Sequence, residues 1–265
     1  MLCNPYIMCG IFCFSATQEK DSNIGINGLK KLEYRGYDSF GTFLIDKTKQ
    51  HIIKEIGEVE NFKIKENIKT KYFLSHTRWA TNGKVNNQNS HPHISNDQNI
   101  IVVHNGIVEN YQEIKNILSN KNYSFYSETD TEVIPNLIQS KMQEGNDFLN
   151  AVNQTCLGIN GRFAFVAFNA QTKEMIGARN GSPLIVGKSK DAIYLSSDAP
   201  AFFDITNKVS YIDDRQMVYI NQNKEENCSF FSIGNLQKIH KKEILLEINT
   251  QEISKNKYKH YMLKK

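Results

Sequence analysis

The segment YIMCGIFCFS, residues 6–15, places a cysteine and a glycine at the head of a strand-like run of aromatic and branched side chains. Two interpretations of Cys9 are open. It is either a small buried hydrophobic residue of the strand, or the nucleophile of an enzyme whose working chain begins there. A thiol becomes a good nucleophile only when another group takes its proton. None of the seven histidines stands at a spacing that identifies it as that base.

The α-amine of Cys9 would itself be a base if the chain began at this residue. Such an amine titrates near ~8, against ~8.5 for a free thiol. Translation from Met8, followed by removal of that methionine, would expose the thiol and the amine together. We therefore expect residues 1–8 to be a wrongly assigned start. A cleaved propeptide and an inactive protein are the alternatives.

Composition excludes several classes of protein. The 265 residues are 40% hydrophobic and 23% charged, as in soluble globular proteins, and are enough to bury a sizeable core. The net charge of +4 comes without an arginine-rich stripe, so we expect no nucleic-acid partner. No apolar run approaches the ~20 residues of a membrane span, and no secretory signal is recognisable. The five cysteines lack paired spacing, which argues against disulfides and structural zinc and favours the cytoplasm. We expect no metal or organic cofactor.

The hydrophobic pattern predicts an α+β fold. Helical periodicity covers residues 27–32, 107–119, 131–143 and 147–158, and strand-like runs cover 9–15, 40–46, 72–76, 100–104, 162–169, 174–179, 183–188, 192–197 and 216–221. The later strands follow one another without helices between them, which indicates antiparallel sheets with helices packed outside. Pro135 fits the first turn of the third helix, and Asp130 is its expected N-cap, with Ser127 and Thr129 as alternatives.

Four segments place polar residues at strand or helix ends: LEYRGYDSFG (32–41), SHTRWATNGKV (75–85), IVVHNGIVEN (101–110) and SETDTEVI (127–134). Arg78 is suited to grip a carboxylate through two hydrogen bonds. The Asn105 amide and the Gly106 N–H could donate together to an oxyanion. Asp130 could bind an ammonium group. Each segment alone also fits an ordinary turn, a surface ion pair or a helix N-terminus.

Together these segments, with MCGIF, ARNGSPLIVG and LSSDAPAF, resemble the class II glutamine amidotransferases, a branch of the N-terminal-nucleophile hydrolases. Within that class the chain is most similar to the glutaminase domains of the glucosamine-6-phosphate synthases (glutamine–fructose-6-phosphate transaminases). The resemblance runs in order from residue 9 to about residue 203, and more weakly to about residue 222. It implies a four-layer αββα sandwich of two antiparallel sheets, the fold of the N-terminal-nucleophile hydrolases.

The resemblance also implies a role for each matched residue. Cys9 would attack the side-chain amide of glutamine, and its α-amine would pass the proton to the leaving ammonia. Asn105 and Gly106 would form the oxyanion hole. The remaining substrate-binding residues would be Arg78 for the carboxylate, Asp130 for the ammonium group, Trp79 and Thr81 in a loop over the site, and Arg35 ordering the cysteine.

The predicted organisation is an N-terminal extension (1–8), a glutamine amidotransferase domain (9–240) and a linker-like basic tail (241–265). In the full synthases such a tail leads to sugar-isomerase domains that bind fructose 6-phosphate, and these could act here in trans. Asn82 replaces a histidine common after RWAT, which affects the expected loop contacts. We expect a glutaminase that makes glutamate and ammonia. The alternative is a catalytically silent glutamine-binding or regulatory subunit, or a truncated paralogue, with a blocked Cys9.

Overall fold

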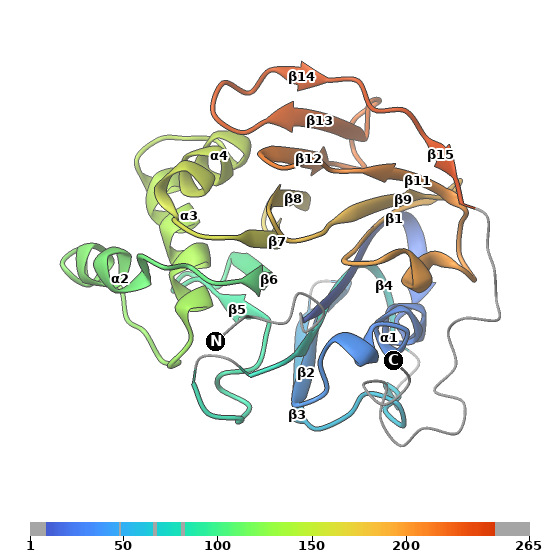
Figure 1. Ribbon diagram of the computed structural model, residues 1–265, viewed down its shortest axis with the longest axis horizontal. Coiled ribbons are helices and arrows are strands. Elements are labelled where there is room, and N and C mark those ends of the chain that lie inside the picture. The colour runs from blue at the N-terminus through green and yellow to red at the C-terminus, as the bar shows by residue number, and fades with distance from the viewer. Residues whose placement is uncertain (1–8, 48, 66–67, 81–82, 247–265) are drawn as a thin grey trace.

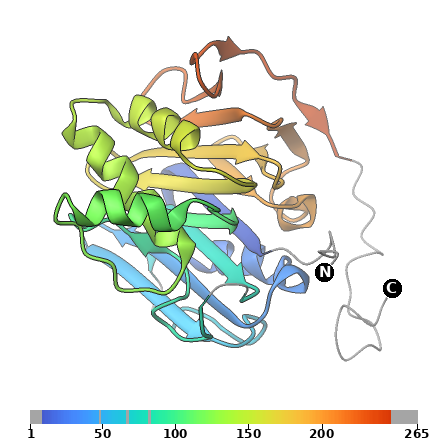
Figure 2. The same ribbon diagram turned by 60° about the vertical axis from the view of Figure 1, so that its left-hand side comes forward.

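The computed structural model describes residues 9–47, 49–65, 68–80 and 83–246. Two antiparallel sheets lie face to face, with helices on both outer sides (Figures 1 and 2). This arrangement confirms the predicted α+β sandwich. The predicted extension at residues 1–8 and residues 247–265 of the predicted tail lie outside the described residues.

The first sheet has β1 (Gly10–Asp21) near its centre, between β10 (Ala192–Ser196) and β4 (Lys69–Arg78). Its strand order is β15-β11-β9-β10-β1-β4-β2-β3. The remaining strands are β2 (Ser39–Asp46), β3 (Lys49–Ile56), β9 (Ile185–Lys188), β11 (Lys208–Tyr211) and β15 (Ile244–Leu245). Because β15 pairs with β11, the sheet continues past residue 240.

The second sheet has the order β14-β13-β12-β8-β7-β6-β5. Its strands are β5 (His93–Ile94), β6 (Ile100–Gly106), β7 (Phe163–Asn169), β8 (Glu174–Asn180), β12 (Gln216–Ile220), β13 (Cys228–Ser232) and β14 (Lys238–Ile239). Every strand pairing in both sheets is antiparallel.

The alternation of side chains along each strand builds three apolar layers. In β1, Ile11 and Cys13 point into the core between the sheets, whereas Phe12 and Phe14 pack on the outer side with α1 (Asn23–Lys30). In the second sheet, one face of β7 lies in the core between the sheets and the other packs against the remaining helices. Both faces of the central strands are therefore buried.

The four predicted helices are present. Three of them begin one to four residues later than predicted and end where predicted, whereas α1 both begins and ends earlier. Helices α2 (Tyr111–Ser119), α3 (Val133–Gln143) and α4 (Phe148–Gly158) cover the outer face of the second sheet. Pro135 lies in the first turn of α3, as predicted. Within the described ranges, no helix is long and apolar enough to cross a membrane.

The predicted N-cap of α3 is wrong. Asp130 lies in a short 3₁₀ turn, η2 (Asp130–Glu132), and its carboxylate accepts a hydrogen bond from the N–H of Val108 at 2.6 Å instead of capping the helix. Ser127 and Thr129 do not cap α3 either, because its N-cap position is Glu132. The Asp130 carboxylate is therefore bonded to a backbone N–H just after β6, and not to an N–H at the start of α3.

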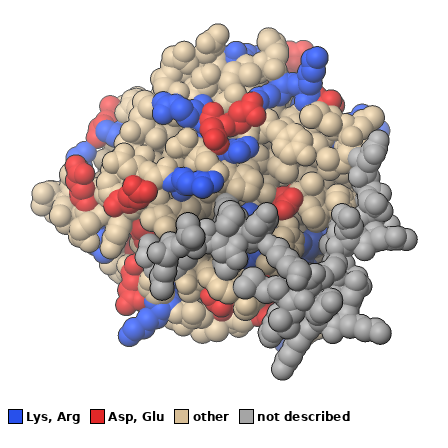
Figure 3. All heavy atoms as spheres, viewed as in Figure 1, with Lys and Arg blue, Asp and Glu red and all other residues tan. Residues whose placement is uncertain are grey.

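Basic and acidic side chains are interspersed on the face shown in Figure 3, outside the grey residues.

The charged edge strand β3 was not predicted, because its sequence KQHIIKEI lacks a clean apolar alternation. It forms because β2 supplies a full ladder of backbone partners from Ser39 to Asp46.

Two glycines of α1 let the helix approach the first sheet closely. A Cβ added at Gly28 would lie 2.5 Å from the ring of Phe12, and one at Gly25 would lie 2.2 Å from the ring of Phe73. We expect Gly28→Ala to lower the free energy of unfolding by ~1–3 kcal/mol, because overpacking outweighs the better helix propensity of alanine. Urea denaturation measures it. Asn27→Ala, at an exposed position of the same helix, is the control and should change stability by less than ~0.5 kcal/mol. A stabilised Gly28→Ala protein would contradict the packing described here.

Candidate functional site

Several of the predicted site residues lie at, or next to, a terminus of one of three strands. Cys9 immediately precedes β1, Arg78 ends β4, and Asn105 and Gly106 end β6. Because β1 and β4 run antiparallel with Gly10 opposite Thr77, the start of one strand meets the end of the other. Strand β6, in the opposite sheet, contacts both of them. One corner of the sandwich therefore gathers residues that are far apart in sequence.

The Cys9 side chain is half-buried against the backbone of Trp79. Its Sγ accepts a hydrogen bond from the Trp79 N–H at 3.2 Å and lies 3.7 Å from the Trp79 carbonyl oxygen, to which a thiol can donate. Burial raises the pKa of the Cys9 thiol, while the Trp79 N–H and the charges of Arg78 and Arg35 oppose that rise. The thiol is therefore protonated at rest and needs a base before it can act as a nucleophile.

Arg35 holds the main chain at Cys9. Its Nε donates to the Cys9 carbonyl oxygen at 3.2 Å, and its Nη1 pairs with Asp198 at 3.2 Å. The hydroxyl of Tyr34 donates to the same carboxylate at 2.5 Å. Asp198 was not predicted as a site residue, although it lies in the quoted segment LSSDAPAF. The carboxylate thus keeps the guanidinium in place against the cysteine.

Arg78 joins the end of β4 to the loop that follows it. Its guanidinium is buried and donates to the carbonyl oxygens of Gly83 at 3.3 Å and Lys84 at 3.2 Å. The indole of Trp79 meets Tyr37 edge to face, with ring centroids 5.2 Å apart. Thr81, the other predicted loop residue, and Asn82 lie outside the described residues.

Asn105 is 1% exposed, and both ends of its side chain have partners. The amide nitrogen donates to Ser197 Oγ at 2.7 Å, and Oδ1 lies 3.1 Å from His76 Nε2. At the next position, Gly106 has φ +145°, and a Cβ there would lie 2.0 Å from the Arg162 carbonyl oxygen. Only glycine fits that close approach.

Asp130 lies on the other side of the β6 end. It is 5% exposed and is bonded to the Val108 N–H, two residues beyond Gly106. Its charge also acts on Arg78 and His104, since it raises the pKa of each against the lowering by burial. Its carboxylate thus belongs to the same corner as the other predicted residues.

Four buried histidines lie behind this corner: His76, His91, His93 and His104. The rings of His76 and His91 have centroids 3.9 Å apart. The hydroxyl of Thr131 lies 2.9 Å from His104 Nδ1 and 3.2 Å from His91 Nε2. These histidines occur in the segments SHTRW (75–79), HPH (91–93) and VVHNG (102–106). Their spacing in the sequence did not show that the four rings pack together.

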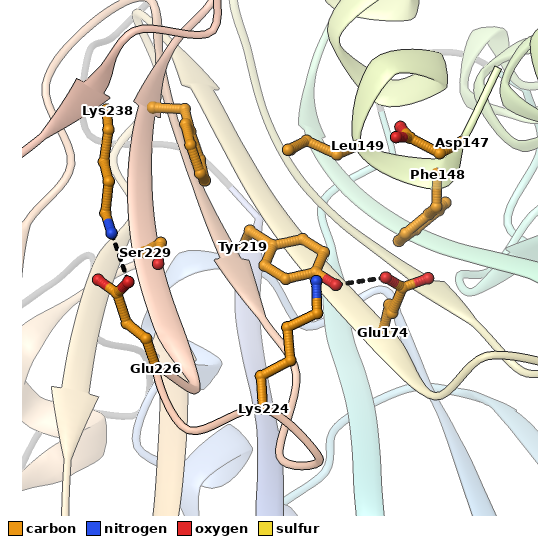
Figure 4. A pocket seen from close by; sticks show the side chains of 10 residues that line it. Asp147, Phe148, Leu149, Glu174, Tyr219, Lys224, Glu226, Ser229 and Lys238 are labelled. Atoms are coloured by element: carbon orange, nitrogen blue, oxygen red, sulfur yellow. Dashed lines mark hydrogen bonds and ion pairs between the residues drawn. The ribbon is translucent and has the colours of Figure 1, made fainter.

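The cavity of about 490 Å³ drawn in Figure 4 contains none of the predicted site residues. Several of its polar groups pair with one another. Tyr219 donates to Glu174, Lys238 pairs with Glu226, and Lys224 Nζ lies 4.8 Å from the centroid of the Tyr219 ring. Among the described residues, one set of side chains has ligand atoms close enough together to hold a metal ion, namely Glu33, Glu58 and Glu60. Cys9 is not part of this set.

The histidine cluster predicts acid sensitivity. Burial lowers the pKa of His76 to about 3 and that of His104 to about 4, and holds those of His91 and His93 well below the usual 6.5. The unfolded chain therefore binds protons that the folded chain does not as pH falls from 6.5 towards 4. The free energy of unfolding should fall over that window by up to about 1.4 kcal/mol per pH unit for each histidine.

Urea denaturation of the wild type and of His93→Gln, measured from pH 7.5 to 4.5, tests this prediction. The carboxylates titrate in both proteins, so the difference between the two pH slopes isolates one histidine. The slope of the variant should be shallower by about one proton. Parallel slopes would contradict the account.

The chain is similar to several known proteins. A family model described as a glutamine amidotransferase domain matches residues 76–204. The glutamine–fructose-6-phosphate aminotransferase of Methanococcus maripaludis is 38% identical over 97% of this chain and 44% of its own length. That of Clostridium acetobutylicum is 40% identical over 97% of this chain and 42% of its own length. The chain thus spans less than half the length of these relatives.

A solved structure shares the fold. The glutamine phosphoribosylpyrophosphate amidotransferase from B. subtilis, complexed with ADP and GMP, matches with a TM-score of 0.71 and 27% identity, over 86% of this chain and 50% of that one. Sequence and fold therefore lead to the same conclusion: this chain carries a glutamine amidotransferase domain with the fold of the N-terminal-nucleophile amidotransferases.

Proposed function

We propose that this chain hydrolyses the side-chain amide of glutamine to glutamate and ammonia, with Cys9 as the nucleophile. The observation that carries the proposal is the contact of Cys9 Sγ with the Trp79 N–H, at the corner where Arg78, Asn105 and Gly106 also lie. A silent glutamine-binding subunit would not need a cysteine held in this way.

The reaction has two halves. The Cys9 thiolate attacks the amide carbon, a C–S bond forms, and the carbonyl π electrons move to oxygen. The oxyanion accepts hydrogen bonds from the Asn105 amide and the Gly106 N–H. When it collapses, the C–N bond breaks and nitrogen leaves as ammonia with the proton taken from the thiol. Water then attacks the thioester, the C–S bond breaks, and glutamate and the free thiol are released.

We assign the proton transfer to the α-amine of Cys9. Burial raises the pKa of the thiol, so a base must act at Sγ itself. Nε2 of His76 already has two partners, the His104 carbonyl oxygen at 2.9 Å and Asn105 Oδ1 at 3.1 Å, and burial lowers the pKa of this histidine to about 3, which makes it a poor base. A free α-amine on the same residue is within reach of Sγ by covalent geometry. This assignment requires that residues 1–8 be absent from the active form.

Charge complementarity supports glutamine as the substrate. Arg78 would hold its carboxylate and Asp130 its ammonium group, and we assign Trp79 and Thr81 to the loop that the resemblance implies over the site. In this assignment the ammonia goes to fructose 6-phosphate bound by sugar-isomerase domains, in the same polypeptide or in trans. The names of the 38–40% identical relatives support that acceptor.

The direct test compares two purified forms, one beginning at Cys9 after methionine removal and one retaining residues 1–8, with intact mass confirming each N-terminus. Glutamate release from glutamine should occur with the short form only. Cys9→Ala in the short form is the control and should be inactive. Equal activity in both intact forms would eliminate the α-amine as the base.

Arg78→Lys tests the substrate assignment. Lysine keeps the charge but loses the planar fork that pairs with a carboxylate, so KM for glutamine should rise by about 10- to 100-fold with a smaller change in kcat. Arg215→Lys, at an exposed position, serves as the matched control and should leave both constants within about twofold. An unchanged KM in Arg78→Lys would remove Arg78 from the binding site.

A further inference from the structure

Asn105 is held from both ends by side chains of the opposite sheet. The imidazole of His76, on β4, lies 3.1 Å from Asn105 Oδ1. The hydroxyl of Ser197, just after β10, lies 2.7 Å from the amide nitrogen. All three residues are at most 1% exposed, so water does not compete for these bonds.

The direction of the first bond follows from the groups around it. His76 Nε2 also lies 2.9 Å from the His104 carbonyl oxygen, which can only accept a hydrogen bond. Nε2 therefore carries the hydrogen and donates to both oxygens. Burial keeps the pKa of His76 at about 3, so the ring is neutral at pH 7 and its hydrogen stays on this nitrogen. The Asn105 side chain is thus oriented with Oδ1 toward His76 and the amide nitrogen away from it.

Ser197 connects this amide to the strand that carries the cysteine. Its Oγ accepts from the Asn105 amide and, at 2.8 Å, from the N–H of Ile11, two residues after Cys9. The Ser197 N–H in turn donates to the Ile11 carbonyl oxygen at 3.0 Å. The distance between the nucleophile strand and Asn105 is therefore set through one serine.

We propose that His76 and Ser197 are positioning residues that aim the Asn105 amide at the substrate oxygen. This inference rests on the proposed function, since it requires Asn105 to donate to an oxyanion. An amide nitrogen has two hydrogens. Ser197 takes one, and the planar geometry of the amide then fixes the direction of the other, which the substrate oxygen receives during attack by Cys9.

The experiment measures kcat and KM for glutamine in the short form of the protein. Removal of an oxyanion donor costs ~10²–10³ in kcat, so Asn105→Ala should lose that much. Ser197→Ala and His76→Leu should lower kcat by about 10-fold or more and change KM by less than about twofold. His76→Gln, which retains an N–H donor, should recover most of the loss. Ser75→Ala removes another buried hydroxyl bonded to β1, through the Phe12 carbonyl oxygen, and is the matched control with unchanged kcat.

Double variants separate positioning from general loss of structure. If Ser197 acts through Asn105, then adding Ser197→Ala to Asn105→Ala should cause no further loss in kcat. Multiplying losses, or an unchanged kcat in Ser197→Ala, would overturn the inference while leaving glutamine hydrolysis intact. Full activity in Asn105→Ala would instead overturn the oxyanion assignment of the proposed function.

A crystal structure of the Ser197→Ala protein gives a readout that does not depend on activity. The Asn105 side chain should rotate or become disordered, while the Cys9 Sγ contact with the Trp79 N–H stays. An unmoved Asn105 would overturn the inference even if the rate had fallen.

Discussion

The pairing register of β1 and β4 is the constraint on which the site depends. With Gly10 opposite Thr77, the preceding cysteine meets the residue that follows β4, and the Trp79 N–H reaches Cys9 Sγ. A slip of one residue would turn every side chain of β1 to the opposite face. Ile11 would leave the core between the sheets and Phe12 would leave α1. The apolar alternation that stabilises the sandwich therefore also fixes the geometry at the end of the strand.

The second constraint is a polar bridge between the two sheets. His76 lies in β4 of the first sheet, Ser197 directly follows β10 of the same sheet, and Asn105 lies in β6 of the second. Their hydrogen bonds connect the two sheets beside the apolar core. Burying such groups is unfavourable unless each is paired, and an apolar contact here would hold the sheets together without that requirement. The bridge is better explained by orientation of Asn105 than by stability.

Much of the fold could be predicted because its central strands are apolar on both faces or alternate cleanly, as in residues 162–169. Strand β3 could not, since charged residues occupy an edge whose pairing is decided by β2. The N-cap assignment of Asp130 failed for a similar reason. A carboxylate before a helix is expected to cap it, but the Val108 N–H, distant in sequence, is its partner.

The predicted site residues came from the segments of the resemblance, and those within the described residues gather at one corner. The sequence analysis missed three residues of this corner, Ser197, Asp198 and His76. What connects each of them to the site is a contact with a residue far away in the sequence. A serine that bridges Ile11 and Asn105 across 186 and 92 residues of sequence separation has no local signal. Only the packing of the two sheets brings those partners together.

The central claim is that Cys9 forms a covalent bond to glutamine, and trapping that bond tests it most directly. The short form is mixed with glutamine, quenched in acid during turnover, and measured by intact mass and peptide mapping. We expect a mass increase of one glutamyl group on the peptide that begins at Cys9, absent when Cys9 is replaced by alanine. Steady glutamate release without any adduct on Cys9, or an adduct on another residue, would contradict it.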